Sequence, residues 1–151
     1  MMVKSMSVTP IQSLAICMIK RASQERNGFD GVCPYHKDCL EGMASGPSIG
    51  ARAGVKASVL ADDDPLWDIE VDYLAQGAMN YTLSFAPQRI IFGGGVSNQS
   101  QLFPKLRKKF AMYLNGYVQV PELDEYLVHA TLGDDAGITG ALLLAKKVVL
   151  Q

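Results

Sequence analysis

The clearest pattern of apolar and polar positions lies in the middle of the chain, in the segment LWDIEVDYLAQGAMNYTLSFA, residues 66–86. Apolar side chains recur there at spacings of three and four residues, which is the repeat of one face of an α-helix. The stripe consists of Leu66, Ile69, Tyr73, Leu74, Ala78, Tyr81 and Phe85. Three aspartates (62–64) and Pro65 precede it, as is typical of a helix start. The pattern therefore predicts a long amphipathic helix that ends before Pro87.

Two short apolar runs alternate with helical patterns in the second half of the chain. QRIIFGGGV (88–96) predicts a buried strand that closes on a tight glycine turn, and EYLVHATLG (125–133) predicts a second strand. QLFPKLRKKFAMYLNGY (101–117) has the pattern of an amphipathic helix with a basic outer face. DDAGITGALLLAKKVV (134–149) predicts a final helix whose acidic start suits the positive end of the helix dipole. Helices and strands in alternation predict an α/β layered sheet.

Composition and charge narrow the class of protein. The chain has 151 residues, of which 48% are apolar and 19% charged, so it can form one domain, or one lobe of a larger protein, with a proper core. A formal net charge of −1 gives no electrostatic basis for binding nucleic acid or an anionic membrane. Gln12 and Ser13 interrupt the apolar part of the amino-terminal segment, which argues against a signal peptide. With three cysteines, an odd number, we expect a cytoplasmic protein without a disulfide scaffold.

The segment GVCPYHKDCLEG (31–42) places Cys33, His36 and Cys39 three positions apart. Thiolate and imidazole are ligands that Zn²⁺ prefers, and a two-residue gap lets a tight turn direct successive side chains at one ion. The spacing favours a metal site over two buried thiols with a surface histidine. A redox pair is disfavoured because the cysteines do not form a C-x-x-C motif. Four candidates for a fourth ligand remain open: Cys17, Asp38, His129 and water.

Two further features of the sequence suit a ligand. Gly93, Gly94 and Gly95 follow the first expected strand, where bare backbone can lie against a flat or phosphorylated ligand. A tight turn between strand and helix explains the same glycines equally well. Glu41 could accept hydrogen bonds from substrate hydroxyls, although the residues alone favour a solvated glutamate at a helix start. That helical pattern, LEGMASGPSIGARAG (40–54), contains glycine and proline and so predicts close backbone packing.

Three stretches in this order, GVCPYHKDCLEGMASGPSIGARAG, IIFGGGV and LGDDAGITGALLLA, resemble the carboxyl-terminal half of ROK-family sugar kinases, especially the bacterial fructokinase branch. The most specific part is the knot motif C-P-Y/F-H-x-D-C-L-E-G. The resemblance implies an α/β fold: the carboxyl-terminal lobe of an actin-like, ribonuclease-H-like two-lobed kinase with a zinc-knot loop. It also implies transfer of the γ-phosphate of ATP, with Mg²⁺, to fructose, which gives fructose 6-phosphate.

The resemblance also implies roles for individual residues. Cys33, His36 and Cys39 match three of the four ligands of a structural zinc ion. Glu41 matches the family's sugar-binding glutamate, which reverses the interpretation from the residues alone. Pro47 matches a turn that approaches the nucleotide. The segment beside the adenosine of ATP is matched by Gly93, Gly94, Gly95 and Val96.

The chain also departs from the family pattern. It has about half the length of a complete kinase, and its sequence contains neither the D-x-G-G-T-K phosphate loop nor the N-D segment that supplies the general base. In AICMIKR, which resembles the strand before the knot, Ile16 or its neighbour occupies the position of the fourth zinc ligand. We therefore expect a divergent amino-terminal segment with a remnant strand (1–30) and a kinase carboxyl-terminal lobe (31–151). No residue is expected to be catalytic, and the isolated chain is expected to be inactive.

The expected partners follow from the same resemblance. They are the hexose fructose and ATP, together with either a second copy of the chain or a separate amino-terminal lobe, and they include neither nucleic acid nor membrane. The alternative is a non-catalytic remnant, or one subunit of a split protein that pairs with a separate amino-terminal lobe. A sugar-responsive repressor is disfavoured because residues 1–30 are too short for a helix-turn-helix module.

Overall fold

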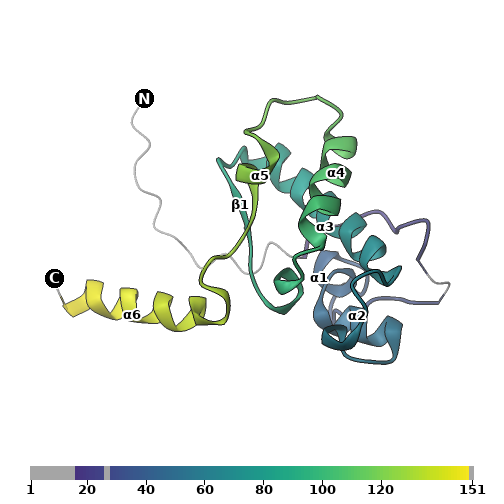
Figure 1. The fold of residues 1–151 in the computed structure, drawn as a ribbon, viewed down its shortest axis with the longest axis horizontal. Coiled ribbons are helices and arrows are strands. Elements are labelled where there is room, and N and C mark those ends of the chain that lie inside the picture. The colour runs from purple at the N-terminus through teal and green to yellow at the C-terminus, as the bar shows by residue number, and fades with distance from the viewer. Residues whose placement is uncertain (1–15, 26–27, 150–151) are drawn as a thin grey trace.

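A computed structural model describes residues 16–25 and 28–149. The helices and strands are α1 (Leu40–Met43), α2 (Gly46–Ala53), α3 (Leu66–Phe85), β1 (Ile90–Phe92), α4 (Leu102–Leu114), α5 (Leu123–Tyr126), β2 (Leu127–His129) and α6 (Ala136–Val149). Short 3₁₀ turns are η2 (Ala57–Val59), η3 (Gly95–Asn98) and η4 (Gly133–Asp135). Helices α3 and α4 pack together at the centre, α1 and α2 lie against α3, and the strands lie to one side (Figure 1). The helices and strands expected in residues 66–149 therefore form, with shorter strands, whereas the remnant strand expected before the knot is represented among the described residues by an isolated bridge at Met18.

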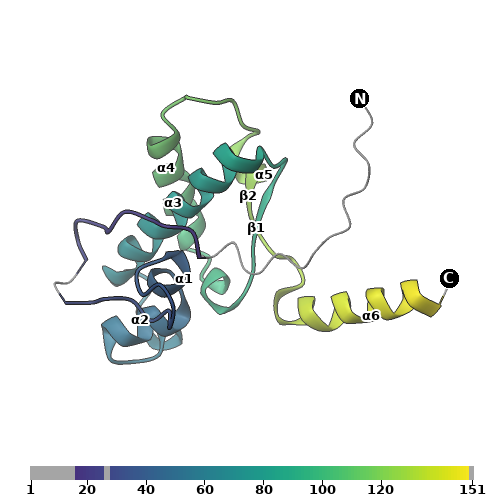
Figure 2. The same cartoon turned by 180° about the vertical axis from the view of Figure 1, so that it is seen from behind.

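The two strands form a parallel sheet in which Ile90 lies opposite Leu127 and Phe92 lies opposite His129 (Figure 2). Parallel strands need a long crossover, and residues 93–126, which include α4 and α5, provide it. Helix α4 packs against α3 on one side and contacts β2 on the other. The α/β class expected from the sequence is confirmed, with a sheet of two strands in the described part of the chain.

Helix α3 contributes side chains to all three apolar clusters of the core. Most of the expected stripe is buried, but the helix also buries Trp67, Val71 and Ala75, which lie on other faces. The helix extends to Phe85 as expected, but this side chain is 59% exposed, so the buried part of the stripe ends before it. At the start of α3, the Asp64 carboxylate accepts a hydrogen bond from the Leu66 backbone N–H at 2.9 Å. This agrees with the helix start predicted from the aspartates before Pro65.

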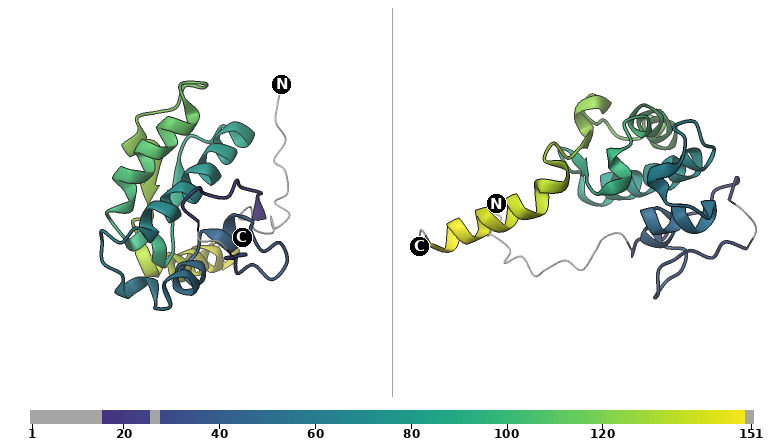
Figure 3. Two further views of the ribbon diagram at one scale, coloured as in Figure 1. Left: turned by 90° about the vertical axis from the view of Figure 1, so that its right-hand side faces the viewer. Right: turned by 60° about the horizontal axis from the view of Figure 1, so that its bottom comes forward.

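Strand β1 departs from the expectation of a buried strand because Ile91 is 64% exposed. Successive side chains of a strand point to opposite faces, and helices of the described residues cover only the face that bears Ile90 and Phe92. Helix α6 also stands apart from the other helices (Figures 1 and 3), and its side chains Ile138, Leu142, Leu143 and Leu144 are 61–69% exposed. None of the helices in the described ranges is long and apolar enough to cross a membrane.

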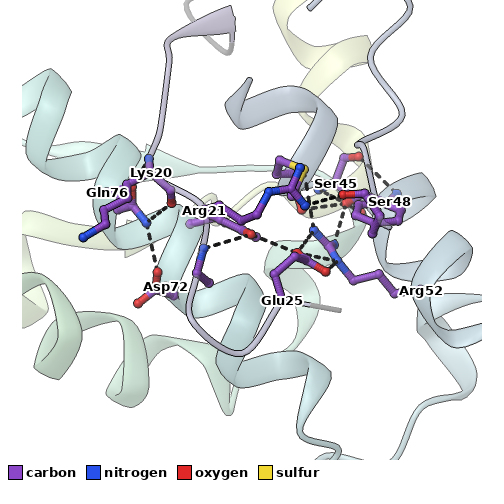
Figure 4. Close-up of polar contacts among 12 residues, drawn as sticks. Lys20, Arg21, Glu25, Ser45, Ser48, Arg52, Asp72 and Gln76 are labelled. Atoms are coloured by element: carbon purple, nitrogen blue, oxygen red, sulfur yellow. Dashed lines mark hydrogen bonds and ion pairs between the residues drawn. The ribbon is translucent and has the colours of Figure 1, made fainter. Parts of the chain in front are cut away.

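Residues 16–25 are tied to the helices by polar contacts (Figure 4). The side chain of Gln76 in α3 exchanges two hydrogen bonds with the backbone of Lys20, at 2.7 and 2.8 Å. Deeper in the molecule, the Arg52 guanidinium of α2 donates two close hydrogen bonds to Glu25, at 2.8 and 3.0 Å, and the Tyr73 hydroxyl donates a third at 2.8 Å. Both side chains of this ion pair are 1% exposed, so it is a buried joint between this segment, α2 and α3.

Candidate metal centre and ligand groove

Cys33, His36 and Cys39, which we call the Cys-His-Cys cluster, lie close together in the loop before and at the start of α1. Their ligand atoms all lie within 4.8 Å of one another. In a tetrahedral zinc site, bonds of about 2.0–2.3 Å put ligand atoms roughly 3.5–3.8 Å apart, so a small adjustment suffices to hold one ion. The two thiols are buried and the imidazole is exposed. The sequence prediction that these three residues meet is confirmed geometrically.

Backbone hydrogen bonds bend the loop into this arrangement. The N–H of Lys37 donates to the carbonyl of Cys33 at 3.1 Å, and Lys37 has a φ of 58°, an uncommon conformation for a residue other than glycine. The carbonyl of Gly42 accepts from the N–H of Val32 at 2.9 Å and closes the base of the loop. Cys39 forms an antiparallel bridge with Met18, which lies in the segment expected to be a remnant strand. The backbone therefore sets the direction of both thiols before any ion binds.

The two thiols differ in their electrostatic surroundings. Hydrogen bonds from the backbone N–H groups of His36 and Tyr35 lower the pKa of the Cys33 thiol to about 7. Burial raises the pKa of the Cys39 thiol, and the neighbouring Cys33 adds to this rise. Two adjacent thiolates repel each other, and a cation between them would stabilise both. The donor set and its charge therefore suit a thiophilic metal ion such as zinc.

The structure does not add a fourth protein ligand from the described residues. Cys17, Asp38 and His129, the three candidates from the sequence, lie outside the Cys-His-Cys cluster. The sulfur of Cys17 lies 3.8 Å from the hydroxyl of Tyr81, and the His129 ring pairs with Asn98 at 3.2 Å. Water, the other candidate, remains open.

Two glycines, Gly31 and Gly42, make the loop possible. A Cβ atom at either Gly31 or Gly42 would overlap the backbone carbonyl of Lys37, and Gly31 has a φ of +87°. Gly42 would also bring its Cβ to 2.9 Å from the Cβ of Cys33. These glycines stand at the two ends of GVCPYHKDCLEG, where a closed loop brings the backbone close to itself.

Gly42→Ala is therefore expected to lower the free energy of unfolding by about 1–3 kcal/mol, the usual cost of overpacking, and to weaken metal binding. The added methyl group pushes the loop that bears Cys33 away from α1. Urea denaturation and metal content of the purified chain measure the two effects. Gly140→Ala in α6 is the matched control, because a Cβ there meets open space and alanine favours a helix. Equal stability of Gly42→Ala and wild type would contradict the packing argument.

Glu41 is exposed in the first turn of α1, while its neighbours Leu40 and Met43 are buried. This position agrees with a solvated glutamate and equally leaves the carboxylate accessible to a ligand. A sugar-binding role for Glu41 therefore stays a prediction.

Pro47 at the start of α2 and Gly95 with Val96 at η3 line one groove of about 780 Å³, together with the cation Lys56. Gly93 and Gly94 line an adjoining cavity of about 270 Å³, whose wall also includes Gly95 and Val96. Residues that match the family's nucleotide-binding segments thus come together from two distant parts of the chain. Gly94 has a φ of +90°, so the turn itself also requires a glycine.

One residue of this region was missed altogether. Glu70 in α3 is 1% exposed and lines the smaller cavity, and neither of its carboxyl oxygens has a hydrogen-bond partner among the described residues. Burial raises its pKa to about 8, with nearby Glu25 adding to the rise and Arg52 opposing it. The available signal was a glutamate with Trp67 three positions before it and Leu74 four positions after it, on one helix face.

A sequence profile of the ROK family matches residues 15–148, and the chain belongs to the ROK family. This family has the actin-like ATPase fold, and the α/β architecture with a small parallel sheet in the described residues agrees with it. It is 55% identical over 118 residues to a fructokinase of Pediococcus pentosaceus and 40% identical over 137 residues to a fructokinase of Streptococcus mutans. It is 30% identical over 128 residues to a glucokinase of Thermotoga maritima.

These alignments cover 78%, 90% and 78% of this chain, in the same order. They cover 41%, 47% and 38% of the three relatives. The chain therefore spans less than half the length of the curated relatives it matches.

Proposed function

We propose that this chain forms the sugar- and nucleotide-binding carboxyl-terminal lobe of an ATP-dependent hexose kinase that converts fructose to fructose 6-phosphate. The observation that carries the proposal is the convergence of Pro47, Gly95 and Val96 in one groove. Fructose is favoured as the hexose because the relatives that are 55% and 40% identical are called fructokinases, whereas the one called a glucokinase is 30% identical.

ATP, accompanied by Mg²⁺, would occupy the groove between α2 and η3. Lys56 is the one charged residue among the described residues that line it, and a cation at its wall suits a phosphate chain. The glycine turn at Gly93, Gly94 and Gly95 leaves backbone exposed, so a ligand can approach it closely.

Zinc would bind to the Cys-His-Cys cluster and hold the loop in place, without taking part in phosphate transfer. Glu41 follows the last of these cysteines by two residues, so fixing the loop also fixes the start of α1. In this proposal the Glu41 carboxylate accepts hydrogen bonds from hydroxyl groups of the sugar.

A base must accept the proton of the attacking sugar hydroxyl, and the 151-residue sequence lacks the motif that supplies it in this family. The isolated chain is therefore expected to show no turnover of fructose and ATP in an assay coupled to ADP formation. The complete Pediococcus pentosaceus fructokinase serves as the positive control. Turnover by the isolated chain would show that a base has been overlooked.

A second candidate function, a subunit that pairs with a separate amino-terminal lobe, is favoured by the exposed apolar side chains of β1 and α6. These side chains would be covered by another protein body, which is either that lobe or a second copy of the chain. Adding a separately produced amino-terminal lobe of the Pediococcus enzyme to the same assay distinguishes the two candidates. Turnover in the mixture supports a split kinase, whereas a dimer without turnover favours a non-catalytic remnant.

A further inference from the structure

The cavity of about 270 Å³ lies between the start of α2, helix α3 and the glycine turn after β1. Gly46, Gly95 and Val96 line both this cavity and the larger groove, so the two spaces adjoin. The cavity is smaller than the roughly 300–1,000 Å³ of sites for drug-sized ligands, so it suits one ring system rather than a whole nucleotide.

Most polar groups at the cavity already have partners. The Ser97 hydroxyl donates to the carbonyl of Gly94 at 2.7 Å, and the Ser45 hydroxyl accepts from the backbone N–H of Ser48 at 3.3 Å. Glu70 is the exception, because both of its carboxyl oxygens are buried without a hydrogen-bond partner among the described residues. A buried carboxyl group in this state destabilises the protein, and such groups call for a functional explanation.

The charges around Glu70 decide which form of the carboxyl is present. Arg52 is the nearby cation, but its guanidinium is already bound to Glu25. The pKa of Glu70 is raised to about 8 by burial, so the group is mostly protonated at pH 7. A protonated carboxyl both donates and accepts a hydrogen bond.

The walls of the cavity indicate the class of ligand. They are formed by glycine backbone and by apolar side chains, among them Leu74, Phe92 and Phe103. A polyol such as a sugar would leave most of its hydroxyls without partners there, at a cost for each one. A flat aromatic ring with a single polar edge would bury its faces against the apolar walls and place that edge at Glu70.

We propose that this cavity binds the base of the nucleotide and that Glu70 determines its specificity by hydrogen-bonding the amino-bearing edge of a purine. This inference rests on the proposed function, because the ribose and phosphates would continue into the groove lined by Pro47 and Lys56. No described residue hydrogen-bonds the buried carboxyl of Glu70, which is a local cost to stability that the base relieves on binding.

The test compares ADP with purine riboside 5′-diphosphate, which lacks the amino group, by isothermal titration calorimetry on the full 151-residue chain. Wild type is expected to bind ADP about 10-fold more tightly, because the probe without the amino group loses one buried hydrogen bond and leaves its partner unpaired. Glu70→Leu is expected to bind both probes alike and to raise Tm by a few degrees, because it removes a buried polar group that no described residue hydrogen-bonds.

The variant Glu70→Gln distinguishes a role of Glu70 in ligand binding from a purely structural role. Its amide also donates and accepts, so the preference for ADP is expected to persist. The charged groups near Glu70 among the described residues are Arg52 and Glu25. Above pH 8 the affinity of wild type for both probes is expected to decline, because the ionised carboxyl no longer donates a hydrogen bond to the purine ring nitrogen, whereas the affinity of Glu70→Gln stays constant.

Asp72→Asn is the matched control on the same helix. Asp72 is also buried, but its carboxylate is paired with Lys109 at 2.8 Å and accepts from Tyr113 at 2.5 Å. This variant is expected to lower Tm and to keep the preference for ADP.

If wild type and Glu70→Leu preferred ADP over purine riboside 5′-diphosphate to the same extent, the inference would be overturned, while nucleotide binding would still be supported. Should Glu70→Leu fail to fold, the same pH profile for wild type and Glu70→Gln would overturn it instead. Failure of wild type to bind either probe at millimolar concentration would overturn both the inference and the proposed nucleotide site.

Discussion

Cys39→Ser is expected to abolish stoichiometric zinc binding and to lower the melting temperature of the chain. The Cys39 thiol is 0% exposed and lies within 4.8 Å of the two other ligand atoms of the Cys-His-Cys cluster. A serine hydroxyl is a poor ligand for zinc and would itself be buried. With free zinc at about 1,000 times its dissociation constant, loss of the ion removes about 4 kcal/mol of stability.

Metal content of the purified protein and thermal unfolding with and without EDTA measure the two effects. EDTA is expected to lower the Tm of wild type but not that of Cys39→Ser, which separates the loss of the ion from the cost of the buried hydroxyl. Cys17→Ser is the matched control, because the Cys17 sulfur contacts Tyr81 outside the cluster. Less than half an equivalent of zinc in wild type, or full occupancy in Cys39→Ser, would contradict the assignment.

Local patterns were sufficient to predict much of this fold. The stripe from Leu66 onward predicted α3, and the spacing of Cys33, His36 and Cys39 predicted their meeting, because each pattern lies within one short segment. The glycine turn after β1 was predicted for the same reason, and Gly94 adopts the positive φ that such a turn needs.

The interactions that the sequence did not predict join distant segments. Nothing near Glu25 in the chain indicates that it pairs with Arg52, 27 positions away. Glu70 shares its cavity with the glycine turn and with the start of α4, which are distant from it in the sequence. The exposure of Ile91 likewise depends on which elements cover each face of a sheet, and an apolar run in one strand carries no such information.

The resemblance to the ROK family predicted more about the candidate site than the chemistry of single residues did. Composition and periodicity left the glycine turn undecided between a ligand site and a plain turn, and they favoured a solvated Glu41. The structure brings Pro47 to Gly95 and Val96 but leaves Glu41 exposed on α1, so it adds a tertiary argument for the groove and none for the sugar contact.

Arg52→Met is expected to lower the free energy of unfolding by about 3–5 kcal/mol, a large part of the roughly 5–15 kcal/mol typical of a domain. The Glu25 carboxylate would remain buried with the Tyr73 hydroxyl but without the guanidinium that neutralises it. Methionine keeps most of the apolar volume of the arginine stem, so the loss reports the charge rather than a cavity. Arg52 also stacks 4.2 Å from the centre of the Phe29 ring, which adds to the loss.

The double variant Arg52→Met with Glu25→Met tests whether the buried ion pair contributes to stability or only to the choice of one conformation. Because two desolvated charges are replaced by apolar groups, the double variant is expected to recover most of the loss. Lys105→Met is the matched control, since the Lys105–Asp68 pair has a similar 2.7 Å separation but exposed side chains and is expected to contribute at most about 1 kcal/mol. Urea denaturation followed by circular dichroism measures all four proteins. If Arg52→Met were as stable as Lys105→Met, the segment 16–25 would not depend on this ion pair, and the contacts of Gln76 with Lys20 would have to hold it against α3.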